Sequence, residues 1–247
     1  MVNNPFSLHG KRIVITGAGS GIGQATAIVC ANLGADVVLL DISGEQLART
    51  MEMLPQAQSK CFTVDLTDSE ALCNLIKEIC LESPIQGLVH CAGISSRKPL
   101  NTLKKEGFSK VMDVNFYSFV ELVKQVAKKG RMSDGGKIVV MSSISSIRGF
   151  KAKTEYCVSK AAVDAFVRCM ALELAPRKIC VNSVMASEVL TPMAIKAKEM
   201  NLSDADFVTP LGPSQPEEVA ATIAFLLSDA TRTISGTSLL IDGGACI

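Results

Sequence analysis

Two patterns of hydrophobic residues alternate along the chain. Short runs such as 13–15 and 37–40 are apolar at every position, whereas longer segments carry apolar residues at the spacing of a helix. Strands that are apolar on both faces are typical of a parallel sheet covered by helices on each side. The runs predict strands at 12–16, 36–40, 61–64, 87–90, 137–141, 179–184 and 238–241, and the longer segments predict helices at 22–33, 69–81, 108–129, 154–175 and 216–228.

This alternation of strand and helix predicts βαβ units, which wind right-handed into an open, doubly wound sheet. We therefore predict an α/β protein with a single-domain Rossmann fold, in which a seven-stranded parallel sheet carries helices on both faces. No linker rich in proline, glycine or serine divides the chain, so residues 1–247 form one predicted domain. The segment 191–215, with three prolines, breaks the alternation and is predicted to lie outside the sheet.

Composition and charge exclude several classes of protein. The 247 residues hold 25 Lys and Arg against 24 Asp and Glu, so the net charge of +1 gives no reason to expect a nucleic-acid partner. The nine cysteines are scattered without a C-x-x-C pair and there are two histidines, so we expect reduced thiols and no metal site. The N-terminus lacks the pattern of a signal peptide, and no apolar run reaches the roughly 18 residues of a membrane helix. We expect a cytoplasmic protein without a membrane segment.

A glycine-rich turn joins the first predicted strand to the first predicted helix. The residues from Thr16 to Gly23 read T-G-x-x-x-G-x-G, and such a turn lets a pyrophosphate approach the amides at the helix N-terminus. The spacing G-x-G-x-x-G fails because Ile22 stands at the third glycine, and a phosphate-binding G-x-x-x-x-G-K loop fails because Gln24 follows Gly23. The position of the turn between strand and helix favours a dinucleotide.

Asp41 ends the second predicted strand, eighteen residues after Gly23. An acid at about this distance accepts hydrogen bonds from the adenosine ribose hydroxyls of NAD. It would repel the 2′-phosphate of NADP, and neither Ser20 nor Ile42 supplies a compensating cation. The alternative is an ordinary aspartate at a strand end. We predict NAD, with NADP less favoured.

Tyr156 and Lys160 are four residues apart in a predicted helix and therefore lie on one face. A nearby ammonium favours the phenolate and is expected to lower the tyrosine pKa, so that the phenol can protonate a carbonyl or deprotonate an alcohol. A surface pair would give the same spacing by chance. However, the chain has two tyrosines in all, and Ser143 follows the fifth predicted strand thirteen residues before Tyr156.

Together these motifs resemble those of the short-chain dehydrogenase/reductase family. The resemblance covers nearly the whole chain and continues in Asp65-Leu66, Asp113-Val114-Asn115 and Ile241-Asp242-Gly243-Gly244. It implies hydride transfer between a nicotinamide cofactor and an alcohol or ketone. It also implies a homotetramer, in which the predicted helices 108–129 and 154–175 form a four-helix interface between two chains.

The resemblance also implies a role for each matching residue. In catalysis, Ser143 would bind the substrate oxygen, Tyr156 would act as general acid/base, Lys160 would hold the nicotinamide ribose, and Asn115 would position a relay water. The implied cofactor contacts are the turn residues Gly17, Gly19, Ser20, Gly21, Ile22 and Gly23, the acid Asp41, the adenine neighbours Asp65 and Leu66, the ribose neighbours Ala92 and Gly93, and Thr191 at the carboxamide.

Two departures from the family pattern change the expected walls of the site. His90-Cys91 replaces the first half of the usual Asn-Asn-Ala-Gly, so the amide bonds that brace neighbouring strands are expected to be lost. Ala186-Ser187 replaces the usual Pro-Gly after the sixth strand, which removes a rigid proline and a permissive glycine. We expect a shifted or more mobile loop at 188–191.

The substrate stays open between three hypotheses. The chain is similar to beta-ketoacyl-acyl-carrier-protein reductases, which usually use NADPH, and Arg177 falls where such an enzyme docks its acidic carrier protein. The companion region 131–134 is altered and includes Asp134. An NAD-linked alcohol, sugar or hydroxy-acid dehydrogenase is the favoured hypothesis, with segment 191–215 as its substrate lid. A dinucleotide-binding sensor or scaffold without catalysis is the third.

Overall fold

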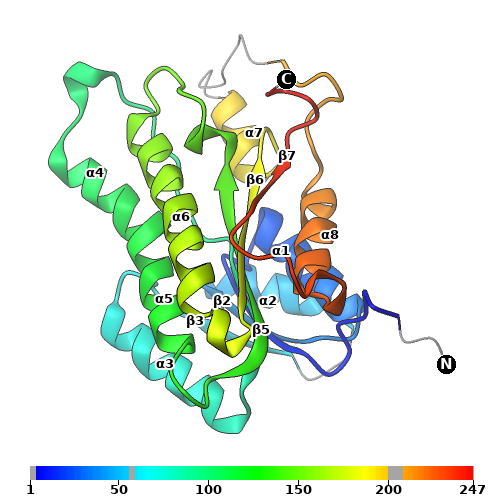
Figure 1. Ribbon diagram of the computed structural model, residues 1–247. Helices are drawn as coiled ribbons and strands as arrows, with labels where there is room; N and C mark the ends of the chain where they lie inside the picture. The colour runs from blue at the N-terminus through cyan, green and yellow to red at the C-terminus, as the bar shows by residue number, and fades with distance from the viewer. Residues whose placement is uncertain (1–3, 56–58, 200–207, 247) are drawn as a thin grey trace.

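A seven-stranded parallel sheet forms the middle layer of the computed structural model, which describes residues 4–55, 59–199 and 208–246 (Figure 1). The strand order is β3-β2-β1-β4-β5-β6-β7, so the chain winds from the centre to one edge and then to the other. The predicted doubly wound fold is therefore confirmed. The strands are β1 (Arg12–Thr16), β2 (Asp36–Asp41), β3 (Lys60–Thr63), β4 (Ile85–His90), β5 (Met132–Ser143), β6 (Cys180–Ala186) and β7 (Ser238–Ile241).

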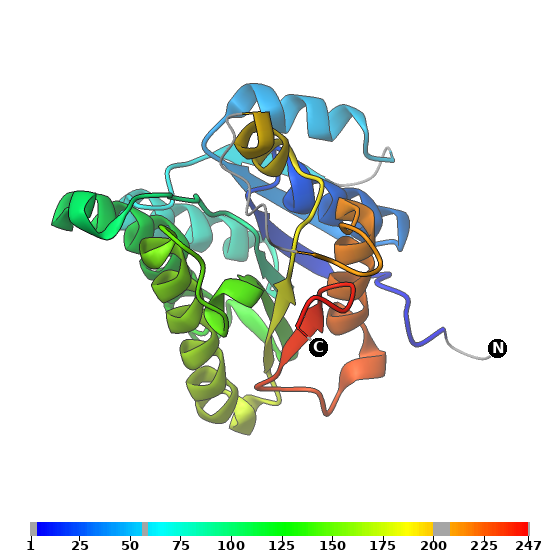
Figure 2. The ribbon, with the colours of Figure 1, turned by 90° about the horizontal axis from the view of Figure 1, so that it is seen from above.

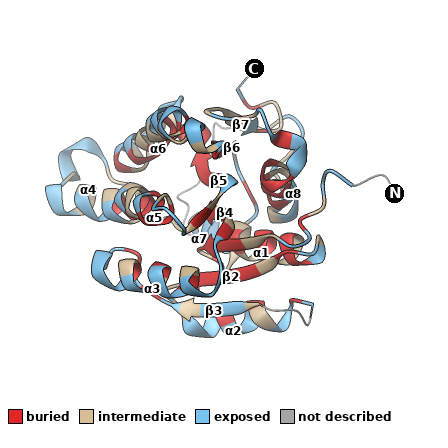
Figure 3. Ribbon diagram, turned by 60° about the horizontal axis from the view of Figure 1, so that its bottom comes forward, coloured by how far each residue is buried: buried red, intermediate tan, exposed pale blue. Residues whose placement is uncertain are grey.

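Helices cover both faces of the sheet, and the side chains of successive residues in a strand point alternately into the two hydrophobic cores. In β1, Ile13 and Ile15 belong to the core beneath α1 and α8, whereas Val14 belongs to the core beneath α3, α5 and α6 (Figure 3). The helices are α1 (Gly21–Asn32), α2 (Gly44–Glu52), α3 (Ser69–Glu82), α4 (Lys105–Met112), α5 (Ser118–Val126), α6 (Thr154–Glu173), α7 (Pro192–Glu199) and α8 (Pro216–Leu227).

The structure differs from the predicted elements in three places. The predicted helix 108–129 is divided into α4 and α5 by the π-helical turn Asp113–Tyr117, which contains Asn115. Strand β5 begins at Met132, five residues before the predicted start. Helix α2 was not predicted; it begins where Ser43 accepts a hydrogen bond from the Gln46 N–H.

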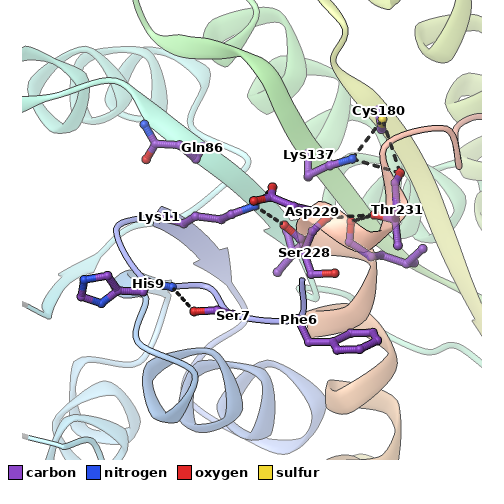
Figure 4. Close-up of polar contacts among 12 residues, drawn as sticks. Phe6, Ser7, His9, Lys11, Gln86, Lys137, Cys180, Ser228, Asp229 and Thr231 are labelled. Carbon is purple, nitrogen blue, oxygen red and sulfur yellow. Dashed lines mark hydrogen bonds and ion pairs between the residues drawn. The ribbon is translucent and has the colours of Figure 1, made fainter. Parts of the chain in front are cut away.

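Lysine side chains close the amino-terminal edge of the sheet. Lys11 Nζ lies 3.0 Å from the Leu227 carbonyl oxygen and 2.6 Å from Asp229 Oδ1. Lys137 is buried, and its Nζ lies 3.0 Å from the Thr231 carbonyl oxygen (Figure 4). These contacts tie the first and fifth strands to the short helix after α8. The opposite, carboxyl-terminal edge is the one left for a ligand, as in other open α/β sheets.

The described parts of the predicted excursion, 191–199 and 208–215, contribute no strand to the sheet. Its helix α7 lies over the carboxyl-terminal edge (Figure 2), and residues 200–207 of the expected lid fall outside the described residues. The base of the segment is closed by hydrogen bonds from Leu190 N to the Ser214 carbonyl oxygen and from Ser214 N to the Glu188 carbonyl oxygen, both 2.9 Å. Whether Ala186-Ser187 makes this loop more mobile stays a prediction.

Among residues 4–55, 59–199 and 208–246, no helix has the length and apolar character needed to cross a membrane. In the same ranges, no three histidine, cysteine or acidic side chains gather where they could hold a metal ion. All nine cysteines carry free thiols.

Candidate active site

A cleft of about 920 Å³ opens at the carboxyl ends of the strands. Most of the residues predicted to bind cofactor or substrate line it, although they come from every part of the chain. Gly19 and Asn115 are not among the lining residues. The predicted residues in its walls are Gly17, Ser20, Gly21, Ile22, Gly23, Asp41, Asp65, Leu66, Ala92, Gly93, Ser143, Tyr156, Lys160 and Thr191.

The glycine turn is built so tightly that side chains could not replace its glycines. Gly17 has φ +66°, and a Cβ there would lie 2.7 Å from the Ala92 amide nitrogen. A Cβ on Gly23 would lie 2.0 Å from the Gly17 carbonyl oxygen. Helix α1 begins at Gly21, so its free N–H groups face the cleft. A bare backbone turn at a helix N-terminus fits the pyrophosphate of a dinucleotide.

Asp41 is held at the end of β2 by two backbone amides. Its Oδ2 accepts from the Gly19 N–H at 2.9 Å, and its Oδ1 accepts from the Ser43 N–H at 3.0 Å. Gly19 therefore acts on the cleft indirectly, because its amide orients Asp41. The half-buried carboxylate stands on the cleft wall, where it fits a ribose diol and disfavours a phosphate.

Asp65 also lines the cleft and is exposed. Hydrogen bonds from the Thr67 N–H (2.9 Å) and hydroxyl (2.7 Å) hold its Oδ1 and keep the pKa of the carboxyl below its usual value. The side chain is thereby fixed as an acceptor beside Leu66. This placement is compatible with the predicted contact to adenine, which stays a prediction.

His90 braces the sheet, which corrects the expectation that this position loses its cross-strand bonds. Its Nδ1 lies 2.9 Å from Thr16 Oγ1 on the neighbouring β1, and its ring stacks on Phe119 with 5.3 Å between centroids. Burial, helped by the charge of Lys160, lowers the pKa of His90 to about 3. The ring is therefore neutral and structural. Sequence reasoning missed this because it compared the position with asparagine and did not weigh imidazole as a donor or acceptor.

Cys91 next to it behaves as a small buried group at the floor of the cleft. Burial raises the pKa of its thiol to about 12, so the side chain is uncharged at neutral pH, and it forms a hydrogen bond with Thr26. The position therefore adds no negative charge beside Lys160.

Tyr156 and Lys160 extend from the first two turns of α6 into the cleft. The Lys160 Nζ lies 5.7 Å from the centre of the Tyr156 ring and donates a 2.8 Å hydrogen bond to the Met141 carbonyl oxygen. Ser143 ends β5; its hydroxyl accepts from the Ser145 N–H at 3.1 Å and lies near enough to the Tyr156 hydroxyl to lower its pKa. The three predicted catalytic side chains therefore meet at one end of the cleft.

The protonation of this group differs from the sequence prediction. Burial raises the pKa of Tyr156 above its usual 10, and the Ser143 hydroxyl only partly opposes this. The expected lowering by Lys160 is wrong for this arrangement, because loss of water around the phenol outweighs other influences. Burial also lowers the pKa of Lys160 to about 8; the Asp164 carboxylate, and the Cys91 thiol once it ionises in alkali, act in the opposite direction. At neutral pH Tyr156 holds its proton and can donate it.

Asn115 is fully buried behind the cleft, in the π-helical turn. Its amide pairs with the backbone of Ile94, accepting from the N–H at 2.8 Å and donating to the carbonyl oxygen at 3.0 Å. It also donates to Ser159 Oγ at 3.0 Å, and Ser159 in turn donates to the Tyr156 carbonyl oxygen at 2.7 Å. Asn115 thus joins the loop after β4 to the helix that carries Tyr156. Ser159 was not singled out from the sequence, where a helical serine gives no signal.

Thr191 begins the excursion over the cleft. Its hydroxyl accepts from the Ala194 N–H at 3.3 Å and so helps to start α7, while its methyl group packs near Gly21. Beside it, Phe150, Lys153 and Met193 add apolar and basic side chains to the outer wall. Met193 belongs to the predicted lid, whereas Phe150 and Lys153 carry no motif and were not predicted to line the site.

The cleft at the switch between β1 and β4, the glycine turn and the Ser143–Tyr156–Lys160 group define a nucleotide-dependent oxidoreductase of the doubly wound α/β class. Residues 17–246 match the family model described as enoyl-(acyl carrier protein) reductase. The chain belongs to the short-chain dehydrogenase/reductase family, whose members act on hydroxyl and keto groups of small molecules.

Relatives of different activity resemble the chain to a similar degree. NAD-dependent glycerol dehydrogenase of Listeria innocua is 34% identical over 98% of this chain and 96% of its own length. L-xylulose reductase of Mus musculus is 36% identical, over 97% and 98%. The 3-oxoacyl-[acyl-carrier-protein] reductase of Thermotoga maritima is also 36% identical, over 97% and 99%.

Solved structures show the same fold. A short-chain type dehydrogenase/reductase from Mycobacterium marinum superposes with a TM-score of 0.89 at 30% identity, covering 99% of both chains. Levodione reductase gives a TM-score of 0.88 at 28% identity, covering 96% of this chain and 98% of the other.

Proposed function

We propose that the protein transfers a hydride between NAD(H) and the carbinol or carbonyl carbon of a small alcohol or ketone, with Tyr156 as general acid/base. The observation that carries this proposal is the placement of Tyr156 next to Ser143 in the wall of the cleft, one helical turn from the Lys160 ammonium. In this proposal Ser143 binds the substrate oxygen, Lys160 holds the nicotinamide ribose, and Asn115 positions a relay water.

The chain's own part in the reaction is to move one proton. In reduction, the carbonyl oxygen would accept hydrogen bonds from Ser143 and Tyr156, and the Tyr156 proton would pass to the oxygen as hydride arrives from the bound nicotinamide. The Lys160 ammonium stabilises the phenolate that remains. In oxidation the same phenolate would take the alcohol proton. A phenol whose pKa lies above neutrality suits the first direction, since it stays protonated until the transition state.

NAD is the proposed cofactor because Asp41 lines the cleft at the end of β2, where its carboxylate would accept from a ribose 2′-hydroxyl and repel a 2′-phosphate. Its two carboxylate oxygens already accept from Gly19 and Ser43, so the side chain cannot easily turn away from the cleft. One relative, the glycerol dehydrogenase of Listeria innocua, is NAD-dependent, which is in line with this proposal.

A free small-molecule substrate is favoured over an acyl chain on a carrier protein. Arg177 would have to offer its charge to an acidic carrier, but its guanidinium is engaged by the Ala127 carbonyl oxygen at 2.7 Å and by Asp134 Oδ1 at 2.9 Å. The Asp134 carboxylate next to it would repel an acidic partner. The cleft is also lined by Phe150, Met193 and Glu188, a mixture of apolar and charged side chains that suits a substrate of mixed polarity.

Assembly as a homotetramer is also proposed. Helices α5 and α6 lie side by side on the left of Figure 1, and apolar side chains on α6 and just before α5 are exposed. Leu172 is 79% exposed and Val158 is 42% exposed on α6, and Tyr117, just before α5, is 56% exposed. Burial of such a surface between two chains would be favourable.

The decisive experiment is a panel of polyols, sugars, hydroxy acids and ketones, with absorbance of the reduced nicotinamide as readout and NAD(H) and NADP(H) in parallel. We expect turnover of at least one free alcohol or ketone with NAD(H). Binding of NADH without turnover across the panel would favour the sensor or scaffold, and activity restricted to carrier-bound 3-oxoacyl chains with NADPH would favour the carrier-protein reductase.

A further inference from the structure

A buried acid lies one helical turn beyond Lys160 on α6. Asp164 is 4% exposed and does not line the cleft. Its Oδ2 accepts from the Ser142 hydroxyl of β5 at 2.9 Å, and its Oδ1 accepts from the Ser183 hydroxyl of β6 at 2.7 Å. Ser183 Oγ is in turn 2.8 Å from Ser238 Oγ of β7. Three strands and the catalytic helix therefore converge on one carboxylate.

The Lys160 ammonium needs a compensating charge, because it is also buried. The titratable groups that face it are His90 and Cys91 from the end of β4, and Tyr156 and Asp164 from α6. His90 is neutral, and burial keeps both the Cys91 thiol and the Tyr156 phenol protonated at neutral pH. Among these groups the carboxylate of Asp164 is the negative charge.

The same carboxylate also reaches the strand that supplies the other catalytic group. Ser142 directly precedes Ser143, and Lys160 Nζ binds the carbonyl oxygen of the residue before Ser142. Lys160 and Asp164 lie on adjacent turns of α6. They thus bind two adjacent residues of β5, Lys160 through its ammonium and Asp164 through its carboxylate. Residues at i and i+4 of a helix lie close enough for their charges to interact.

We propose that Asp164 is a positioning residue that keeps Lys160 in its charged form and holds, through Ser142, the end of β5 that carries Ser143. This inference rests on the proposed function, since it assigns Asp164 to the proton-handling group. It does not place Asp164 in contact with substrate or cofactor.

The first test is the pH profile of kcat/KM for reduction, measured for wild type, Asp164→Asn and Ser183→Ala. Loss of the carboxylate lowers the pKa of Lys160 from about 8 by on the order of one unit, so the alkaline limb moves to lower pH. The loss relative to wild type should then grow from about twofold at pH 7 to about fivefold at pH 8. Ser183→Ala removes the hydroxyl that bonds to Asp164 and Ser238 but keeps the carboxylate charge, so the alkaline limb of its profile stays in place. A uniform loss at every pH in Asp164→Asn would reduce Asp164 to a structural residue and overturn the proposal.

The second test uses thermal unfolding and needs no activity. Lys160→Met leaves Asp164 as an uncompensated buried carboxylate, so Tm falls; adding Asp164→Asn removes that charge, so Tm rises again. Additive losses in the double variant would overturn the proposal even if Asp164→Asn alone does not fold. A wild type that turns over no substrate would instead refute the proposed function, and the Tm cycle would still report the charge pairing.

Discussion

The Oδ2 atom of Asp41 lies 2.9 Å from the amide nitrogen of Gly19, which joins the end of β2 to the glycine turn. The contact explains why a glycine that does not line the cleft still belongs to the site. A side chain at Gly19 would meet this carboxylate, because its Cβ would lie 3.0 Å from Oδ2. The residue proposed to select the cofactor and the turn proposed to bind its phosphates are thus joined by a hydrogen bond.

Replacement of Asp41 by asparagine should weaken the choice between the two cofactors. The amide can still accept from Gly19 or Ser43, but it no longer repels a 2′-phosphate. We expect the ratio of kcat/KM for NADH to kcat/KM for NADPH to fall by about tenfold or more. A tenfold fall corresponds to a loss of roughly 1.4 kcal/mol in the free energy that discriminates between the two cofactors. Asp36→Asn, at the other end of β2, is the matched control and should keep the ratio. A wild type that prefers NADPH would contradict the role given to Asp41.

Replacement of Tyr156 by phenylalanine should separate binding from chemistry. The ring stays, so NADH binding measured by fluorescence should be retained, while turnover should fall by at least about a hundredfold because the proton donor is gone. The chain provides its own control in its second tyrosine, Tyr117, which is 56% exposed and does not line the cleft. Tyr117→Phe should turn over normally. Near-normal turnover in Tyr156→Phe would remove it from the reaction.

The fold was predictable because its signals are local and repeated. Apolar runs such as 37–40 can bury all their side chains only in a strand that lies between two layers of helices. The glycine turn indicates which strand precedes the first helix. The division of the predicted helix 108–129 was not predictable, since a π-helical turn needs one extra residue per turn and leaves no periodic signature in so short a stretch. It is the buried amide of Asn115, bonded to Ile94, that accompanies this turn in the structure.

The motifs of the site could be predicted from the sequence, but the protonation of its side chains could not. The spacing of Tyr156 and Lys160 indicates proximity, yet the direction of the tyrosine pKa depends on burial, which only the packed structure supplies. Asp164 illustrates the same point. It stands four residues after Lys160 in the sequence, but its importance comes from Ser142 and Ser183 on two strands.

Assembly can be tested through the exposed face of α6. We expect four chains per particle by light scattering at micromolar concentration. Leu172→Glu would place a charge among apolar side chains of the proposed interface and should lower the mass of the particle. Leu81→Glu on α3, where the leucine is 77% exposed, is the control and should leave the mass unchanged. A monomeric wild type would refute the tetramer.

The neutral state of His90 should make the fold sensitive to acid. The pKa of His90 is about 3 in the folded chain and about 6.5 when unfolded, so between these values the unfolded chain binds a proton that the folded chain does not. The stabilisation is complete above pH 6.5 and is lost as the pH falls toward 3. The slope for one such proton is about 1.4 kcal/mol per pH unit.

Urea unfolding of wild type and His90→Asn at pH 7 and pH 4.5 measures this contribution. Asparagine can keep a hydrogen bond to Thr16 but does not titrate, so acid sensitivity shared by both proteins belongs to other groups. We expect wild type to lose on the order of 2–3 kcal/mol more than the variant over this range. Equal losses would mean that His90 already takes up its proton in the folded chain. In that case its bond to Thr16 could not be the neutral brace between β4 and β1 described above.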